Sequence, residues 1–345
     1  MPLEAYAAFL DDEIIRLQSS SGGIFTALAR CILYNHGVVY GVAMAEDCKS
    51  AEVVRVDSVT ALVRLRGSKY MQASTGDCFQ KAKTDLEAGL LVLYSGTPCQ
   101  INGLKLFLQK DYSNLLCVDI ICHGVPSPLL WKKNVSDLEH KQSKKLKAVN
   151  FRAKRPSAFA DVWGNLSPTK QISVPFGQDS YMKMFLNNYC LRPSCYKCAS
   201  KVFRLSDLSI GDFWGIENVA PEMNDAKGIS LVIIRSEKGR EFFCQLEGIR
   251  EKKVRYEDAI RENEAESTSV SQPAIREQFF NDLSRLNYSE MEERFFPVPL
   301  KRRIKNLLLK TPARSLLEKK KRGLANMDYY VQYTLGCRTE KKDLK

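Results

Sequence analysis

The chain has 345 residues, of which 44% are hydrophobic, 10% aromatic and 27% charged, as in ordinary globular proteins. This composition excludes an intrinsically disordered chain. The formal net charge is +12, but residues 301–345 carry 14 Lys/Arg and only 4 Asp/Glu, so the excess lies mainly there. A nucleic-acid-binding domain normally carries its basic residues on the folded body, so the charge distribution argues against a nucleic acid partner.

The apolar segments of the sequence are short. No run approaches the roughly 18 apolar residues that a membrane span requires, and the first 16 residues lack the basic start of a signal peptide. We therefore expect a cytoplasmic protein without a membrane span. The 11 cysteines of such a chain indicate reduced thiols and metal ligation rather than a disulfide framework.

The first predicted elements are a helix and a pair of strands. The helix begins at Ile24, after the polar loop 19–23, and its apolar residues recur at helical spacing until Gly37 ends it. Residues 38–44 and 51–57 are rich in β-branched side chains, which favours two paired strands.

Helical and strand patterns then alternate. They predict a helix, a buried strand, a helix and a second buried strand over residues 77–89, 90–96, 97–109 and 114–122. Two buried strands joined by one helix form a βαβ unit with parallel strands. Because ligands bind beyond the carboxyl ends of such strands, we expect a site near Ser95–Cys99 and Cys122–Pro126.

The second half predicts a mixture of elements. Short strands are expected over 146–175, a helix over 178–189, strands near 206–216 and 228–236, and helices afterwards. The cysteine-containing segment 190–201 has no periodicity. Phe296-Pro297-Val298-Pro299 predicts a linker to the basic segment.

The cysteines give the strongest chemical signal. Cys195 and Cys198 form the only C-x-x-C motif, and Cys99 and Cys122 follow the two buried strands, so four thiolates could surround one centre. Thiolates suit iron–sulfur clusters and zinc alike. Two alternatives stay open: Cys99 and Cys122 are small buried hydrophobic residues, or Cys190, whose spacing also fits a [2Fe–2S] ferredoxin, replaces one ligand.

Two glycine-containing segments are candidates for phosphate binding. Ser21-Gly22-Gly23 precedes a helix, whose N-terminal amides and dipole favour anions. Gly67-Ser68-Lys69-Tyr70 offers a flexible backbone, a hydroxyl, a cation and an aromatic ring. The alternatives are an ordinary helix cap and a surface turn. Neither Gly-x-Gly-x-x-Gly nor a Walker A loop occurs, which argues against ordinary Rossmann and P-loop sites.

Three histidines are available for acid–base chemistry near neutral pH: His36, His123 and His140. His36 follows a predicted helix and His140 lies in a charged helix end, so both are expected to be solvated. His123 directly follows Cys122 at the predicted strand end, and it is either a catalytic residue or a turn residue.

Seven short motifs occur in one order between about residues 15 and 245: SSSGGIFTAL, RGSKYMQ, YSGTPCQINGL, DIICHGVPSP, CLRPSCYKC, SDLSIGDFWGI and KGISLVIIRSEKG. In this order they resemble the coenzyme F420 hydrogenase/dehydrogenase beta-subunit family. The resemblance implies a flavin-dependent oxidoreductase that carries FAD and one [4Fe–4S] cluster. It also implies electron transfer between a ferredoxin-like donor or partner redox subunit and a small organic acceptor such as the deazaflavin coenzyme F420.

The resemblance assigns site residues motif by motif. The implied cluster ligands are Cys99, Cys122, Cys195 and Cys198. The implied flavin-binding residues are Ser21, Gly22, Gly23, Thr26, Gly67, Ser68, Lys69, Tyr70, Gly124, Gly228 and Ser230. His123 is the candidate catalytic residue. Asp212, Phe213 and Trp214 match a family motif but receive no role.

We therefore expect a mixed α/β fold in which residues 1–295 form a flavin-binding core with a βαβ unit and an inserted cluster loop at about 190–201. Residues 296–345 are expected to form a basic helical tail, which either packs on the core or contacts an acidic partner or an anionic membrane surface. Many relatives begin with a ferredoxin-like cysteine segment that this sequence lacks, so a separate protein is expected to supply electrons.

Two other functions fit the same cysteines. The first is a zinc-stabilised four-cysteine binding module without redox activity. The second is a thiol–disulfide enzyme that uses Cys195 and Cys198.

Overall fold

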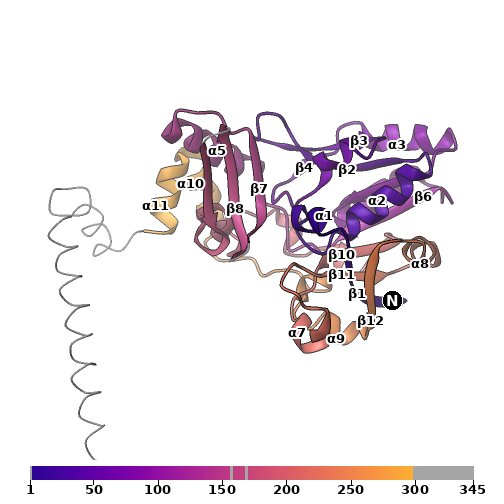
Figure 1. The fold of residues 1–345 in the computed structure, drawn as a ribbon. Coiled ribbons are helices and arrows are strands. Elements are labelled where there is room, and N and C mark those ends of the chain that lie inside the picture. Colours follow the sequence, from indigo (N-terminus) through magenta and orange to yellow (C-terminus); the bar gives the residue numbers. More distant parts are fainter. Residues whose placement is uncertain (1, 156–157, 168–169, 298–345) are drawn as a thin grey trace, which may run out of the picture. The chain divides into compact units, whose positions relative to one another are not determined.

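The computed structural model describes residues 2–155, 158–167 and 170–297 (Figure 1). The chain divides into two compact units after Ser289. The basic tail predicted for 296–345 lies outside the described residues except for residues 296 and 297, so its helix and the domain boundary at residue 295 stay predictions. Within the described ranges, no helix is long and apolar enough to cross a membrane.

The first unit is built on a large mixed sheet with the strand order β12-β1-β11-β10-β6-β5-β2-β3-β4. Its strands are β1 (Glu4–Leu10), β2 (Val38–Met44), β3 (Ala51–Val56), β4 (Ala73–Ser74), β5 (Val92–Gly96), β6 (Leu115–Ile120), β10 (Leu208–Asp212), β11 (Ser230–Ile234) and β12 (Ile249–Val254). The mixed α/β fold class expected from the sequence is confirmed.

The helices of the first unit lie between these strands in the sequence or follow the last of them. They are α1 (Glu13–Gln18), α2 (Ile24–Tyr34), α3 (Cys78–Glu87), α4 (Pro98–Leu108), α5 (Pro128–Gln142), α6 (Ser180–Leu186), α7 (Ile216–Val219), α8 (Glu237–Cys244), α9 (Tyr256–Ala259) and α10 (Arg276–Arg285). A last helix, α11 (Tyr288–Phe295), spans the division between the units.

Four neighbouring strands of the sheet, β2, β5, β6 and β10, run parallel. The predicted βαβ unit is present as β5, α4 and β6, and the predicted strand pair is present as the antiparallel β2 and β3. In β5 and β6 almost every side chain is buried, because helices cover both faces of the sheet. The sequence of these strands is therefore continuously apolar rather than alternating.

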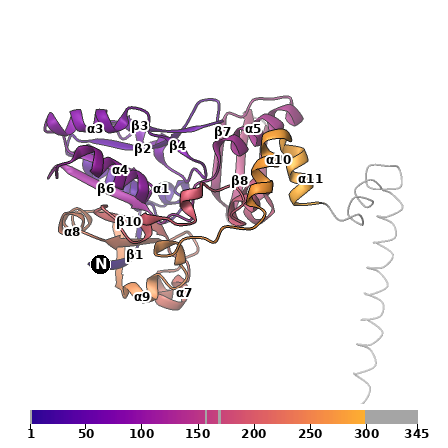
Figure 2. The ribbon, with the colours of Figure 1, turned by 180° about the vertical axis from the view of Figure 1, so that it is seen from behind.

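Alternate side chains of each strand enter cores on opposite faces of the sheet. Leu93 of β5 packs with Ile24 and Leu28 of α2 on one face, whereas Tyr94 packs with Ile101 of α4 on the other. The two views of the ribbon show α2 in front of the sheet in one and α4 in front of it in the other (Figures 1 and 2). The sheet is therefore held between two layers of helices, and its strand ends stay open for a site.

The sequence analysis missed two strands, β1 and β12. β1 lies between β11 and β12 and pairs antiparallel with both. Its sequence, EAYAAFL, is rich in alanine, which has a low β propensity, and β12, IREKKV, is mostly charged because it is an edge strand. Neither segment shows the pattern of an independent strand, since each depends on partners far away in the chain.

A second, three-stranded antiparallel sheet consists of β7 (Ala148–Arg155), β8 (Ala158–Ser167) and β9 (Lys170–Pro175). It agrees with the short strands predicted for 146–175. Figure 1 shows this sheet beside the large one, next to α5. The cysteine-containing segment that follows α6 holds only two short 3₁₀ turns, Pro193–Cys195 and Ala199–Lys201, as its lack of periodicity predicted.

Candidate functional site

A cavity of about 520 Å³ lies at the carboxyl ends of the parallel strands. Its wall includes Val42 on β2, Ser95 on β5, Ile120 on β6 and Ile210 on β10. This is the edge of the sheet at which the βαβ pattern predicts a ligand. The volume lies in the range of about 300–1,000 Å³ that is typical of cofactor sites.

The cavity wall joins the two glycine-containing segments that the sequence singled out. Ser21, Gly23 and Thr26 line it, and so do all four residues from Gly67 to Tyr70. The Ser20 hydroxyl oxygen accepts hydrogen bonds from the backbone N–H of Ser68 at 2.7 Å and from the Ser68 hydroxyl at 3.0 Å. Segments almost fifty residues apart in sequence therefore form one continuous surface.

The loop before α2 is held tightly against the sheet. Gly22 N–H donates to the hydroxyl of Ser230 at 3.0 Å, and the Ser21 hydroxyl donates to the carbonyl of Ile229 at 2.7 Å. Gly23 begins α2 at a φ of +89°, a conformation that favours glycine. The N-terminus of α2 is therefore fixed at the cavity wall, where its amides and dipole favour an anion.

Gly22→Ala should destabilise the protein by about 1–3 kcal/mol and weaken any ligand binding in the cavity, because a methyl group would overpack the contact between this loop and the sheet. A Cβ atom at position 22 would lie 2.4 Å from the carbonyl oxygen of Ala8 and 2.7 Å from the backbone nitrogen of Ser230. Urea unfolding measures the change. Gly177→Ala is the control, since a Cβ atom there meets nothing within 4 Å; equal stability of the two variants would contradict the prediction.

Two cationic side chains contribute to the same wall. Lys69 donates from Nζ to the carbonyls of Leu65 at 2.9 Å and Arg66 at 2.8 Å, and burial lowers its pKa to about 7. Arg66 also lines the cavity, and its Nε is buried without a hydrogen-bond partner among the described residues. Burial lowers the pKa of Arg66 too. A buried donor without a partner is costly, so this wall is suited to an anionic ligand.

Aromatic and charged side chains surround Tyr70. Its ring lies 5.7 Å from the ring of Phe151 and 5.2 Å from that of Phe185. The guanidinium of Arg152, on β7, pairs with Asp212 at 2.9 Å, and Asp212 lines the cavity. The motif residue Asp212, which received no role from the sequence, thus connects the small sheet to the cavity.

The remaining sequence-predicted residues lie less directly at the cavity. Ser230 lines it, whereas Gly22, Gly124, Gly228 and His123 are not part of its wall. Gly228 has a φ of +93°, and its carbonyl accepts from Arg16 at 2.9 Å and 3.0 Å. A Cβ atom at Gly124 would lie 2.7 Å from Leu191. These glycines shape the backbone around the cavity.

His123 is part of a packed cluster. Its Nε2 is hydrogen-bonded to Asn188 Oδ1 at 2.7 Å, and its ring lies 5.1 Å from that of Phe185. Burial lowers the pKa of His123. Its catalytic role stays a prediction, while the contacts seen are those of a positioned imidazole.

The four candidate cluster ligands come from three segments that meet beside the cavity. Cys99, which lines the cavity, is in the first turn of α4, whose N-cap Thr97 forms a capping box with Gln100. Cys122 follows β6, and Cys195 and Cys198 lie in the loop of 3₁₀ turns.

The thiols of these cysteines influence one another. Burial raises the pKa of Cys122 to about 12, and Cys99 and Cys195 contribute to the rise. Burial also raises the pKa of Cys195, with contributions from Cys99 and Cys198. In the described ranges, no three His, Cys, Asp or Glu side chains are spaced to hold a single metal ion. The four thiols therefore lie near one another without forming a binding site for a single metal ion in the described ranges.

Cys190, the reserve ligand, has a different environment. It is fully buried, and burial raises the pKa of its thiol to about 12, with Arg276 as the charged group that opposes the rise. Its carbonyl accepts from the N–H of Ser127 at 2.8 Å. These contacts are those of a core residue, although the ligand set itself stays a prediction.

Sequence reasoning missed Arg66 and Arg152. Arg66 directly precedes the predicted Gly67–Tyr70 segment, and a basic residue beside a proposed phosphate contact was a usable signal. Arg152 gave no signal, because its place beside Asp212 depends on how the small sheet packs in three dimensions.

Comparisons with known proteins agree with this architecture. Two models of one family, described as "Coenzyme F420 hydrogenase/dehydrogenase, beta subunit", match the chain. The model of the family's N-terminal part matches residues 5–77, and the model of its C-terminal part matches residues 90–260. A search of curated proteins found no match.

Among solved structures, a chain of the F420-reducing [NiFe] hydrogenase complex from Methanosarcina barkeri is similar, with a TM-score of 0.51 and 17% sequence identity. The match covers 85% of this chain and 91% of that chain. At this identity, the likeness shows a shared fold. The two family matches, which together cover well over half of the sequence, show that the chain belongs to the coenzyme F420 hydrogenase/dehydrogenase beta-subunit family.

Proposed function

We propose that this chain is an iron–sulfur flavoprotein oxidoreductase that passes electrons between a ferredoxin-like partner or redox subunit and an organic hydride acceptor such as coenzyme F420. The observation that carries the proposal is that Cys99 belongs both to the wall of the 520 Å³ cavity and to the group of four interacting thiols. A cofactor in the cavity and a cluster on the thiols would therefore be neighbours.

The cavity residues fit FAD. The N-terminus of α2, the amine of Lys69 and the Nε of Arg66, which has no partner among the described residues, offer a cationic and hydrogen-bonding wall for a diphosphate. The cavity wall also includes apolar residues such as Val42, Leu65 and Ile210, which suit a planar ring and exclude water.

The cysteines fit one [4Fe–4S] cluster. Four thiols from three segments form a donor set of soft ligands, and the Val125 N–H, which donates to Cys195 Sγ at 3.4 Å, is the kind of contact that tunes a cluster. When bound, flavin and cluster together supply the conversion between two-electron and one-electron transfer. Cys99, which belongs to both groups of residues, would bring the two sites side by side.

The direct test is anaerobic purification of the full chain followed by iron, sulfide, zinc and flavin analysis. Iron and sulfide near four of each per chain, with one FAD, would support the proposal. Stoichiometric zinc without flavin would instead support the zinc-stabilised binding module, and it would sink the redox function. An assay of the holoprotein with deazaflavin, nicotinamides and ferredoxin then identifies donor and acceptor.

FAD affinity should fall as the pH rises above 7, by up to about tenfold per pH unit. Burial lowers the pKa of Lys69 to about 7, so its amine is charged below pH 7 and neutral above it in the ligand-free protein. An anionic diphosphate favours the charged amine, raises this pKa and takes up a proton on binding. Fluorescence titration of flavin-free protein with FAD, repeated at several pH values around 7, measures the slope with which the affinity changes with pH.

Lys69→Met should flatten this slope and weaken binding at low pH, while iron content stays nearly unchanged. Lys227→Met is the control, because Lys227 is only partly buried, does not line the cavity and pairs with Glu13. A Lys69→Met variant that keeps both the slope and the affinity of the unaltered protein would show that Lys69 only caps the carbonyls of residues 64–66.

A further inference from the structure

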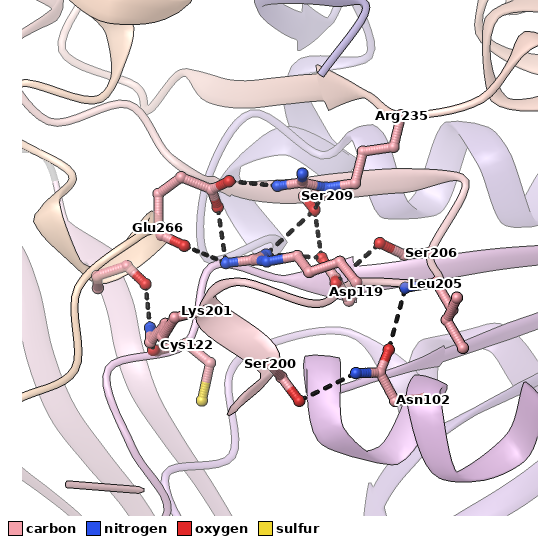
Figure 3. Close-up of polar contacts among 12 residues, drawn as sticks. Asn102, Asp119, Cys122, Ser200, Lys201, Leu205, Ser206, Ser209, Arg235 and Glu266 are labelled. Carbon is pink, nitrogen blue, oxygen red and sulfur yellow. Dashed lines mark hydrogen bonds and ion pairs between the residues drawn. The ribbon is translucent and has the colours of Figure 1, made fainter. Parts of the chain in front are cut away.

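A polar cluster with buried ion pairs lies beside the candidate ligand Cys122 (Figure 3). We call it the polar clamp and define it as Asn102, Asp119, Lys201, Arg204 and Glu266. Three of its members are each three residues from a candidate ligand in the sequence: Asn102 from Cys99, Asp119 from Cys122 and Lys201 from Cys198. The clamp thus belongs to the same segments as the ligands.

The first part of the clamp connects α4 to the cysteine loop. The side chain of Asn102, which is 8% exposed, donates from Nδ2 to the Ser200 hydroxyl at 3.1 Å and to the Phe203 carbonyl at 2.8 Å. Its Oδ1 accepts from the Leu205 N–H at 3.0 Å. One amide therefore holds three residues of the loop against the helix that carries Cys99.

The second part connects the loop to the end of β6. Lys201 Nζ donates to the carbonyl of Cys122 at 2.6 Å and also to that of Ala265. The guanidinium of Arg204 lies 3.4 Å from Asp119 Oδ1 and 3.0 Å from Glu266 Oε2. The loop after Cys198 is therefore fastened to the strand that precedes Cys122.

The buried ion pairs join two carboxylates to two guanidinium groups, and Lys201 adds a third cation nearby. The side chains of Arg204, Asp119 and Glu266 are 4%, 1% and 2% exposed, and Arg235 is a second cation that pairs with Glu266. Ser206 and Ser209 add hydroxyl donors to Asp119. A buried ionic network of this kind is costly unless every group is paired, so it specifies one arrangement of its segments.

The part of the loop after Cys198 has little apolar packing. It contains one short 3₁₀ turn, Ala199–Lys201, and its apolar side chains Val202 and Phe203 are 93% and 55% exposed, whereas Leu191 and Tyr196, before it, are buried. Hydrogen bonds to backbone groups must therefore replace hydrophobic packing in fixing its course.

We propose that the polar clamp positions the three ligand-carrying segments so that the four cysteines are arranged before a cluster binds, with Asn102 as the principal positioning residue. This inference rests on the proposed function for the identity of the ligand. The clamp contacts backbone and loop side chains and does not supply a ligand itself.

The test compares Asn102→Leu with Asn114→Leu. Asn114 also donates two hydrogen bonds from its amide to backbone carbonyls, those of Leu86 and Leu90, but it lies at the opposite end of β6. We expect Asn102→Leu to speed iron release to a chelator about 10- to 100-fold, as losses of outer ligand contacts typically do. It should also speed hydrogen exchange of backbone amides in 195–206 and alter the paramagnetic resonance spectrum of the reduced protein.

Asn114→Leu should change thermal stability by a similar amount without these local effects. Lys201→Met, which removes the donor to the Cys122 carbonyl and keeps the stem, is the second variant if Asn102→Leu does not fold. Equal rates of iron release and of hydrogen exchange in the two asparagine variants would contradict the proposed positioning role of the clamp. Unaltered protein that binds no iron would overturn the proposed function and the cluster role, while the exchange data still show whether Asn102 orders the loop.

Discussion

Cys195→Ser protein should keep less than about a tenth of the iron of the unaltered protein after anaerobic purification, because losing a ligand costs more than losing a contact to one. Serine is a hard, weakly acidic donor, whereas iron–sulfur clusters require thiolates. The substitution also changes the atom that accepts the Val125 N–H at 3.4 Å. Iron and acid-labile sulfide, measured per chain, report the loss.

The control for this experiment is Cys244→Ser. Cys244 is an exposed free thiol at the end of α8, and it contributes to no candidate site, so this variant should keep its iron. Cys48 would be a poorer control because it is buried. Full iron content in Cys195→Ser together with loss in Cys190→Ser would replace Cys195 by Cys190 in the ligand set.

Arg204→Met should destabilise the protein by about 3–5 kcal/mol, enough to unfold a domain of ordinary stability. Asp119 and Glu266 are almost fully buried, and methionine would leave Asp119 without its cation and Glu266 with only Arg235. The loss arises mainly from the stranded charge of Asp119 rather than from the missing attraction. Denaturant unfolding followed by circular dichroism measures it.

Arg240→Met provides the matched comparison. Arg240 also faces two carboxylates, Glu4 and Glu237, but its side chain is 36% exposed and solvent screens these pairs, so its loss should destabilise the protein far less. Adding Asp119→Asn to Arg204→Met removes one stranded charge and should restore part of the stability. If Arg204→Met and Arg240→Met unfold at the same denaturant concentration, the buried network does not hold the fold.

The sequence was sufficient for the parts of the fold whose signals are local. The unit of β5, α4 and β6 could be predicted because two continuous apolar runs flank a helix with Thr97 and Pro98 at its start. The carboxyl ends of the strands then indicated where a cavity would lie. β1 could not be predicted, because its alanines become a strand only through pairing with residues 230–254.

The candidate site also has a part that the sequence predicted and a part that it could not predict. Short motifs identified the loop at Ser21 and the segment at Gly67, and the structure brings both into one cavity wall. The environment of Lys69 could not be predicted, because its bonds to the carbonyls of Leu65 and Arg66 require the turn that those residues form. The pairing of Arg204 with Glu266 spans 62 residues and has no sequence signature.

The position of β1 has a consequence for synthesis on the ribosome. β1 leaves the ribosome before every other described strand, yet both of its neighbours, β11 and β12, are translated more than two hundred residues later. At about 5–20 residues per second, this strand remains on the order of 10–50 s with both edges unpaired. During that interval, nascent chains on the same message can pair through β1 and aggregate. A chaperone that shields Glu4–Leu10 should therefore raise the yield of native protein more than one that acts after release.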